Sequence, residues 1–179
     1  MLQIILIFFI FFGSVVNATD VSSPPEGYTW MYIDEINANF LLPNDWYYLK
    51  EKQGKTLAIF LSKEKISEGN IFDTGVSINV FRGNPSAPRQ LKEMIDGLAQ
   101  KFGATVLETF IDPFIQLNTQ YESVRKEDGV QMRIVNIVLV NIKTKTSYLI
   151  IYESPVSLWE KHWPIGKTII NTVDIKSDI

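Results

Sequence analysis

Two apolar segments near the C-terminal end constrain the fold more than any other part of the chain. They are Gly129–Ile142 and Ser147–Glu153, and the polar link between them, Lys143–Thr146, is short enough to close a hairpin. Each arm begins by alternating polar and apolar residues, but Ile137–Val140 is apolar without interruption. Alternation indicates one solvent-facing side, whereas an unbroken run indicates that both sides are covered. The sequence therefore predicts a long antiparallel pair at the centre of a sheet, with layers packed on both faces.

The first 18 residues have the composition of a secretory signal peptide. Leu2–Phe12 is nearly all Ile, Leu and Phe, and Val16 and Ala18 occupy the small-residue positions that precede a cleavage site. One feature is atypical of a signal peptide, because no Lys or Arg precedes the apolar run. The competing interpretation of this segment is an uncleaved membrane anchor. The run is shorter than the roughly 20 residues that span a bilayer. We therefore expect cleavage near Ala18, an extracytoplasmic (periplasmic or secreted) protein, and no membrane span in the mature chain.

The rest of the chain is predicted to consist of a short spacer and one domain. Residues 19–27 are polar and contain Pro24 and Pro25, which is typical of a flexible spacer. Residues 28–179 form the predicted domain, and a chain of this length buries roughly 68–70% of its unfolded surface. Because the sequence has no cysteine, this core must stabilise the fold without disulfides.

The charge of the chain argues against nucleic acid as a partner. The formal net charge is −3, and the leader contributes no ionisable side chain to it. No cluster of Lys and Arg is dense enough to match a phosphate backbone or an acidic membrane surface. We expect a protein partner instead.

Strand patterns dominate the sequence on both sides of one clear helix. The helix is predicted over Ser86–Phe102, with Ser86 as N-cap and Gly103 as its left-handed stop. A closing helix is predicted to begin at Ser154 and Pro155, and Pro164 is expected to kink or restart it. The predicted strands are 28–33, 37–46 (ending in a turn), 46–52, 56–62, 76–82, 105–111, 114–124 and the two arms of the hairpin. Strands in antiparallel runs with helices on either side predict an α+β fold, a single-domain α-β-α sandwich.

Several motifs taken together resemble the PsbP-like family and its Mog relatives. They are Phe40–Trp46 (FLLPNDW), similar to the family's Phe-x-x-Pro-x-x-Trp strand and turn; Thr74–Val80, the strand before the first helix; the hairpin of residues 129–153; and Glu153-Ser-Pro with Trp159, Trp163 and the final Ile/Val stripe. The resemblance covers most of residues 37–175. It implies an antiparallel sheet between helical layers.

The resemblance also implies a role in binding. Members of this family include extrinsic subunits of photosystem II, Ran-binding nuclear proteins, secreted bacterial proteins and chaperones for effector proteins, and most of them act by binding. The spacer at residues 19–27 lacks the basic docking segment of the plant photosystem subunits, and the leader argues against a nuclear partner. A secreted bacterial member is the expectation that fits both features.

Asp73-Thr-Gly75 matches the signature of aspartic proteases. That chemistry needs two carboxylates that share a proton across a cleft, and a single copy would require a homodimer to supply the second. The alternative is a turn that enters the strand at residues 76–82, with Asp73 as a cap. A dimeric aspartic hydrolase that uses Asp73 is therefore the remote enzymatic hypothesis.

The other chemical candidates are isolated. His162 is the only histidine, and it is predicted to face solvent or the edge of the closing helix. The adjacent acidic pairs, Asp34-Glu35 and Glu127-Asp128, have no spacing of a calcium or zinc site. We therefore expect no catalytic, cofactor or metal site, and the sequence does not identify the binding residues.

Aromatic residues point to a binding surface. Trp46, Tyr47 and Tyr48 cannot all turn inward from one strand, so at least one of them is expected to be exposed or covered by another element, and exposed aromatics are enriched at interfaces. The leading hypothesis is a non-catalytic extracytoplasmic binding or accessory protein. The alternative is a chaperone or adaptor that holds apolar segments of a client protein in a groove beside the sheet.

Overall fold

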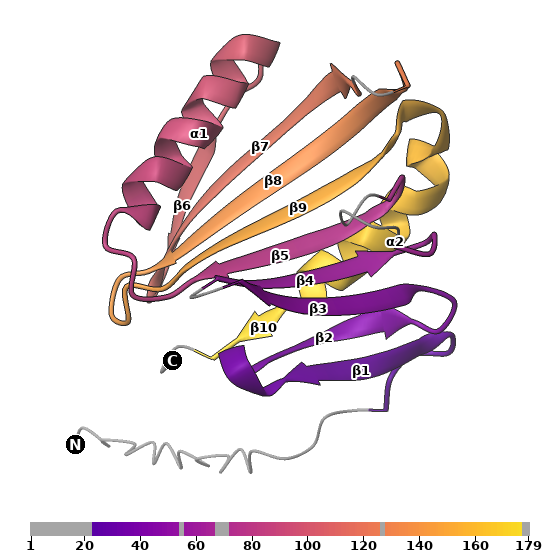
Figure 1. Cartoon of the computed structure of the whole chain (residues 1–179), viewed down its shortest axis with the longest axis horizontal. Helices are drawn as coiled ribbons and strands as arrows, with labels where there is room; N and C mark the ends of the chain where they lie inside the picture. The colour runs from indigo at the N-terminus through magenta and orange to yellow at the C-terminus, as the bar shows by residue number, and fades with distance from the viewer. Residues whose placement is uncertain (1–22, 54–55, 67–71, 126–127, 177–179) are drawn as a thin grey trace, which may run out of the picture.

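The computed structural model describes residues 23–53, 56–66, 72–125 and 128–176, which form two antiparallel sheets and two α-helices (Figure 1). This composition confirms the predicted α+β class. The predicted leader (residues 1–18) lies outside the described residues. So do residues 19–22 of the predicted spacer and parts of the predicted turns at 53–55, 62–70 and 126–129.

The larger sheet contains seven strands in the order β3-β4-β5-β9-β8-β7-β6, and all neighbouring strands are antiparallel. Its strands are β3 (Tyr47–Gln53), β4 (Thr56–Ser62), β5 (Gly75–Phe81), β6 (Leu107–Ile111), β7 (Phe114–Val124), β8 (Gln131–Asn141) and β9 (Ser147–Pro155). The order consists of two meanders, β3-β4-β5 and β6-β7-β8-β9, which are joined where β5 pairs with β9.

The predicted central hairpin is formed by β8 and β9. Strand β9 is the fourth of the seven, and Ile137 of β8 lies opposite Ile150 of β9. Successive residues of a strand point to opposite faces. Leu149 and Ile150 are 7% and 2% exposed, respectively, so side chains on both sides of β9 are buried.

Helix α1 (Ala87–Phe102) packs against β7, β8 and β9 on one face of the large sheet. The apolar core between them consists of Leu91, Ile95, Leu117, Val138 and Leu149. The helix ends at Gly103, which has the predicted left-handed conformation (φ 66°) and donates its N–H to the carbonyl of Ala99. Ser86 does not cap the helix with its side chain, because its hydroxyl bonds to Asn84 Oδ1 at 2.8 Å.

Helix α2 (Trp159–Thr172) packs against β5 and β9 of the large sheet, in a second apolar core that it shares with a smaller sheet. Its strands are β1 (Tyr28–Ile33), β2 (Ala38–Pro43) and β10 (Asp174–Ile175), in the order β1-β2-β10. The larger core lies between this layer and the large sheet, and its fully buried members include Phe40, Ile59, Ile78, Tyr148 and Ile169. In Figure 1 the small sheet lies beside β3, at the end of the large sheet away from α1.

The closing helix begins later than the sequence predicted. Ser154 and Pro155 are the last residues of β9, where Ser154 is fully buried and its hydroxyl lies 3.3 Å from Thr74 Oγ1. A 3₁₀ turn, η2 (Val156–Leu158), connects β9 to α2, and α2 then runs through Pro164 as one helix. Among the described residues, neither helix combines the length and the apolar composition needed to cross a bilayer.

Candidate functional site

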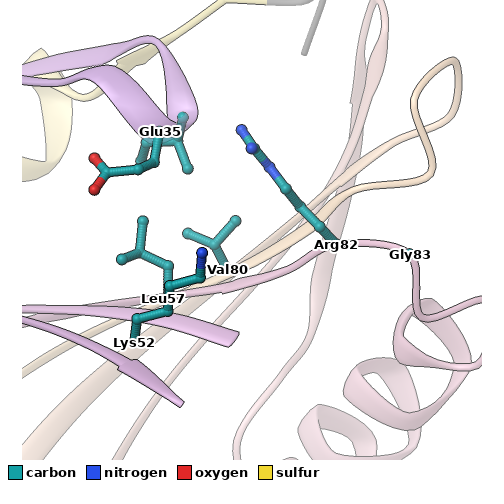
Figure 2. A pocket seen from close by; sticks show the side chains of 7 residues that line it. Glu35, Lys52, Leu57, Val80, Arg82 and Gly83 are labelled. Carbon is teal, nitrogen blue, oxygen red and sulfur yellow. The ribbon is translucent and has the colours of Figure 1, made fainter. Parts of the chain in front are cut away.

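A cavity of about 480 Å³ lies between the turn η1 (Asp34–Ile36) and strands β4 and β5 (Figure 2). Its apolar walls are Ile36, Leu57 and Val80, and its charged residues are Glu35, Lys52 and Arg82. Cavities of 300–1,000 Å³ with mostly apolar walls and a few polar groups are typical of small-molecule sites. This cavity is therefore the candidate binding site for a small molecule.

The strand register explains how these residues meet. Leu57 of β4 lies directly opposite Val80 of β5. Val76, Ile78 and Val80 alternate along β5 toward the larger core, and Arg82, two residues beyond Val80, continues the same face. A cation at a position where the alternating pattern predicts an apolar residue is the signal in the sequence that could have identified this site.

Arg82 extends from the end of β5 into the cavity (Figure 2). Its Nε and Nη2 atoms are buried, and neither has a hydrogen-bond partner among the described residues. A guanidinium group stays protonated in proteins, so Arg82 is a partly buried positive charge with two buried, unused nitrogen donors. Such groups are costly to bury unless a partner binds them.

Glu35 lines the same cavity but is engaged elsewhere. Its carboxylate accepts a hydrogen bond from Lys50 Nζ at 2.6 Å, and this bond holds the pKa of Glu35 below its ordinary value. Figure 2 shows the carboxylate turned away from Arg82. Glu35 therefore does not neutralise the guanidinium.

Tyr148 of β9 lies opposite Val80, on the strand next to β5. The side chain is fully buried, and its hydroxyl has no hydrogen-bond partner among the described residues. Burial raises the pKa of Tyr148, and the charge of Arg82 acts in the opposite direction. The tyrosine is thus a neutral buried hydroxyl whose electrostatic environment includes the Arg82 cation.

Asp73 lies in an ion pair, at the turn that enters β5. Its carboxylate accepts a hydrogen bond from Arg125 Nη1 at 2.7 Å, and the same guanidinium also binds Asp128. Asp73 is half exposed, and its partner in the ion pair is the Arg125 cation. Asp73 therefore lies in an ion pair with Arg125 that bridges two turns, whereas the alternative from the sequence was a turn with Asp73 as a cap.

His162 is buried, and the prediction of a solvent-facing histidine was wrong. The side chain is 6% exposed and shares the inner face of α2 with Trp159, Gly166 and Ile169. The error arose because the helix was predicted to begin at Ser154. In the helix that begins at Trp159, residues 159, 162, 166 and 169 recur at three- and four-residue spacing, and they form its buried face. Burial lowers the pKa of His162, so the ring is neutral at pH 7.

The edge strand β6 carries three of the four most exposed large apolar side chains among the described residues of the large sheet. Leu107, Phe110 and Ile111 are 63%, 61% and 55% exposed, and all five residues of β6 are exposed. The prediction of an exposed aromatic at residues 46–48 is confirmed: Trp46 is buried, whereas Tyr47 is 49% exposed. No three His, Asp or Glu side chains of the described residues are grouped so that they could hold a metal ion.

Comparison with family models and with curated protein sequences gives no match. The chain is similar to several solved structures. Cyanobacterial PsbP (CyanoP) from Synechocystis sp. PCC 6803 gives a TM-score of 0.54 at 13% identity, covering 92% of this chain and 100% of that one. LpqN of Mycobacterium tuberculosis, which is involved in cell envelope biogenesis, gives a TM-score of 0.48 at 10% identity, covering 83% of this chain and 90% of that one. The Ran-binding protein Mog1p of Saccharomyces cerevisiae gives a TM-score of 0.46 at 7% identity, covering 83% of this chain and 95% of that one.

The PsbP comparison covers 92% of this chain. Of the three, it is the one with a TM-score above 0.5. At 13% identity it establishes the fold and leaves the partner open. The chain has the PsbP fold, which confirms at the level of the fold the resemblance that its motifs predicted.

Proposed function

We propose that this protein is a non-catalytic binding or accessory protein that acts outside the cytoplasm, after removal of residues 1–18. Residues 28–179 act as a single domain, with helical layers on both faces of the large sheet. Two features support a binding role. The two residues that the sequence offered as catalytic candidates are engaged elsewhere: Asp73 lies in an ion pair, and His162 is buried in the core. The apolar strand β6 is open to a partner.

The exposed edge at β6 is the observation that carries the proposal. An edge strand presents unpaired backbone N–H and C=O groups, and proteins usually protect such edges with Lys, Pro or bulges. Within β6 the only charged residue is Glu108, whereas the opposite edge strand, β3, carries Lys50, Glu51 and Lys52. The β6 edge is thus suited to an extended segment of a partner protein that adds a strand to the sheet.

Site-specific crosslinking tests this proposal. A photoreactive phenylalanine analogue replaces Phe110 in one variant and Tyr32 in a matched control, since Tyr32 is 57% exposed on the small sheet. We expect one dominant adduct with another protein from Phe110 and none from Tyr32, in the extracytoplasmic fraction. Introducing Leu107→Lys into the Phe110 variant is expected to abolish the adduct. Equal adducts from both positions, or recovery of the protein only from the cytosol, would contradict the proposal.

The same experiment separates an accessory protein from a chaperone or adaptor. A chaperone that holds apolar segments would give adducts with many unrelated proteins from Phe110. An accessory protein would give one. An adduct between two copies of this chain would instead identify β6 as a dimer edge and would overturn the assignment of a different partner.

A further inference from the structure

We propose that the cavity beside Arg82 binds a small amphipathic carboxylate, a molecule with an apolar body and a single anionic group. The carboxylate would accept hydrogen bonds from the Arg82 guanidinium, and the body would lie against Ile36, Leu57 and Val80. This cavity lies between the turn η1 and the β4–β5 part of the large sheet, whereas β6 is the opposite edge strand. The inference is therefore independent of the partner surface.

The charge of the ligand follows from the buried donors. Nε and Nη2 of Arg82 are buried and unpartnered among the described residues. The guanidinium presents donors in a planar fork that matches a carboxylate in a bidentate arrangement. A neutral molecule would leave this buried charge uncompensated, and a cation would be repelled by it.

The neighbouring groups strengthen the preference for an anion. Glu35 is held by Lys50 at 2.6 Å, so its charge is compensated at the mouth of the cavity. Lys52 lines the cavity and adds a second positive charge. Tyr148 lies opposite Val80 on the neighbouring strand β9 but does not line the cavity.

The size and walls of the cavity define the rest of the ligand. A volume of about 480 Å³ accommodates a small molecule or the last residue of a peptide, and it is too small for a folded partner. The walls contributed by Ile36, Leu57 and Val80 favour an aliphatic body. A carboxylate next to an aliphatic group occurs in free aliphatic acids and at the C-terminus of a peptide that ends in Leu, and the two sources share this chemistry.

Titration with defined probes tests the proposal on the full domain. The probes are octanoate, octan-1-ol as the uncharged counterpart, and a tripeptide ending in Leu in its free-acid and amide forms. Methyl NMR of Ile36, Leu57 and Val80 reports binding at the cavity. We expect the octanoate or the free-acid peptide to shift these methyl signals, and octan-1-ol and the amide to bind more weakly. Whichever acid binds more tightly identifies the source.

Two variants and a control make the result specific. Arg82→Gln removes the charge and is expected to weaken binding of the acid by about tenfold or more, while octan-1-ol binds as before. Arg89→Gln removes an arginine that is 74% exposed on α1 and should leave binding unchanged. Leu57→Phe, which fills the cavity, should weaken both acid and alcohol.

Circular dichroism verifies that each variant is folded, and thermal unfolding gives a second readout. Without ligand, Arg82→Gln is expected to melt at a higher temperature than the wild type, because a partly buried charge with unpartnered donors has been removed. A variant that melts lower and still binds the acid as the wild type does would overturn the proposal. So would equal binding of octanoate and octan-1-ol, or methyl shifts confined to residues away from the cavity.

Discussion

Gly166 of α2 lies directly against the aromatic ring of Tyr152 of β9, and the space between them does not admit a Cβ atom. The same ring contacts Trp159 and Trp163, at centroid distances of 5.4 and 5.3 Å. The close approach of the closing helix to the centre of the sheet therefore depends on a residue without a side chain.

Gly166→Ala should consequently destabilise the protein. A methyl group at this position overlaps the Tyr152 ring, and overpacking of a buried contact costs about 1–3 kcal/mol, which exceeds the gain of about 0.5–1 kcal/mol from replacing a helical glycine. Gly97→Ala on α1 is the matched control, because nothing lies within 4 Å of its added Cβ, and it should stabilise the fold. Urea unfolding of both variants measures the difference. Opposite signs are expected, and a stabilising Gly166→Ala would refute the packing argument.

The buried histidine should make stability depend on pH. Burial lowers the pKa of His162 in the folded state, Lys161 and Lys63 act in the same direction, and Glu64 and Asp45 oppose them. The unfolded chain takes up the proton near the ordinary value of 6.5, so between the two values the unfolded state binds more protons. The stabilisation is complete above pH 6.5 and is lost as the pH falls through the folded pKa.

Denaturation between about pH 5 and pH 8 measures this effect. His162→Gln should remove the part of the slope that belongs to the histidine. The single imidazole signal in the NMR spectrum should titrate below 6.5. A midpoint at or above that value would contradict the burial argument.

The bridge between Asp73 and Arg125 should contribute modestly to stability. Asp73→Asn is expected to cost about 0.2–1 kcal/mol, because the carboxylate is half exposed and Arg125 keeps its bond to Asp128. The wild type and the variant are expected to leave a casein substrate intact at acidic pH. Cleavage by the wild type that disappears in Asp73→Asn would restore the hydrolase hypothesis.

Two isoleucines of the large sheet should respond very differently to the same substitution. Ile78 of β5 is fully buried in the larger core, and Ile78→Ala should cost about 2–5 kcal/mol. Ile111 of β6 is 55% exposed, and Ile111→Ala should stay within about 0.5 kcal/mol of the wild type. Equal losses in chemical denaturation would mean that the β6 edge is already covered.

The strands were predictable because their signals are local. The predicted limits of three strands, at residues 28–33, 56–62 and 114–124, agree with the structure, and the α1 helix differs from its prediction by one residue. Alternation along a strand and glycine at a helix end both act within a few residues. The apolar run at residues 137–140 also predicted the central position of the hairpin.

The failures arose where distant pairing overrides a local signal. Ser154-Pro155 has the pattern of a helix start, but the two residues continue β9 because they pair with Arg133 and Met132 of β8. Strand β10 is only two residues long, and it exists because β2, far earlier in the chain, pairs with it. The cavity likewise brings together segments that are adjacent only in the folded chain, so its walls could not be predicted from spacing.

The junction between β5 and β9 also sets an order of events during synthesis. The strands β3, β4 and β5 leave the ribosome in sequence and can pair with one another at once. The second edge of β5 stays unpaired until β9 is synthesised, some 66 residues after the end of β5 (residue 81 to residue 147). Through that interval the nascent chain exposes Val76, Ile78 and Val80 at an open edge, and this is the period in which a chaperone would protect it best.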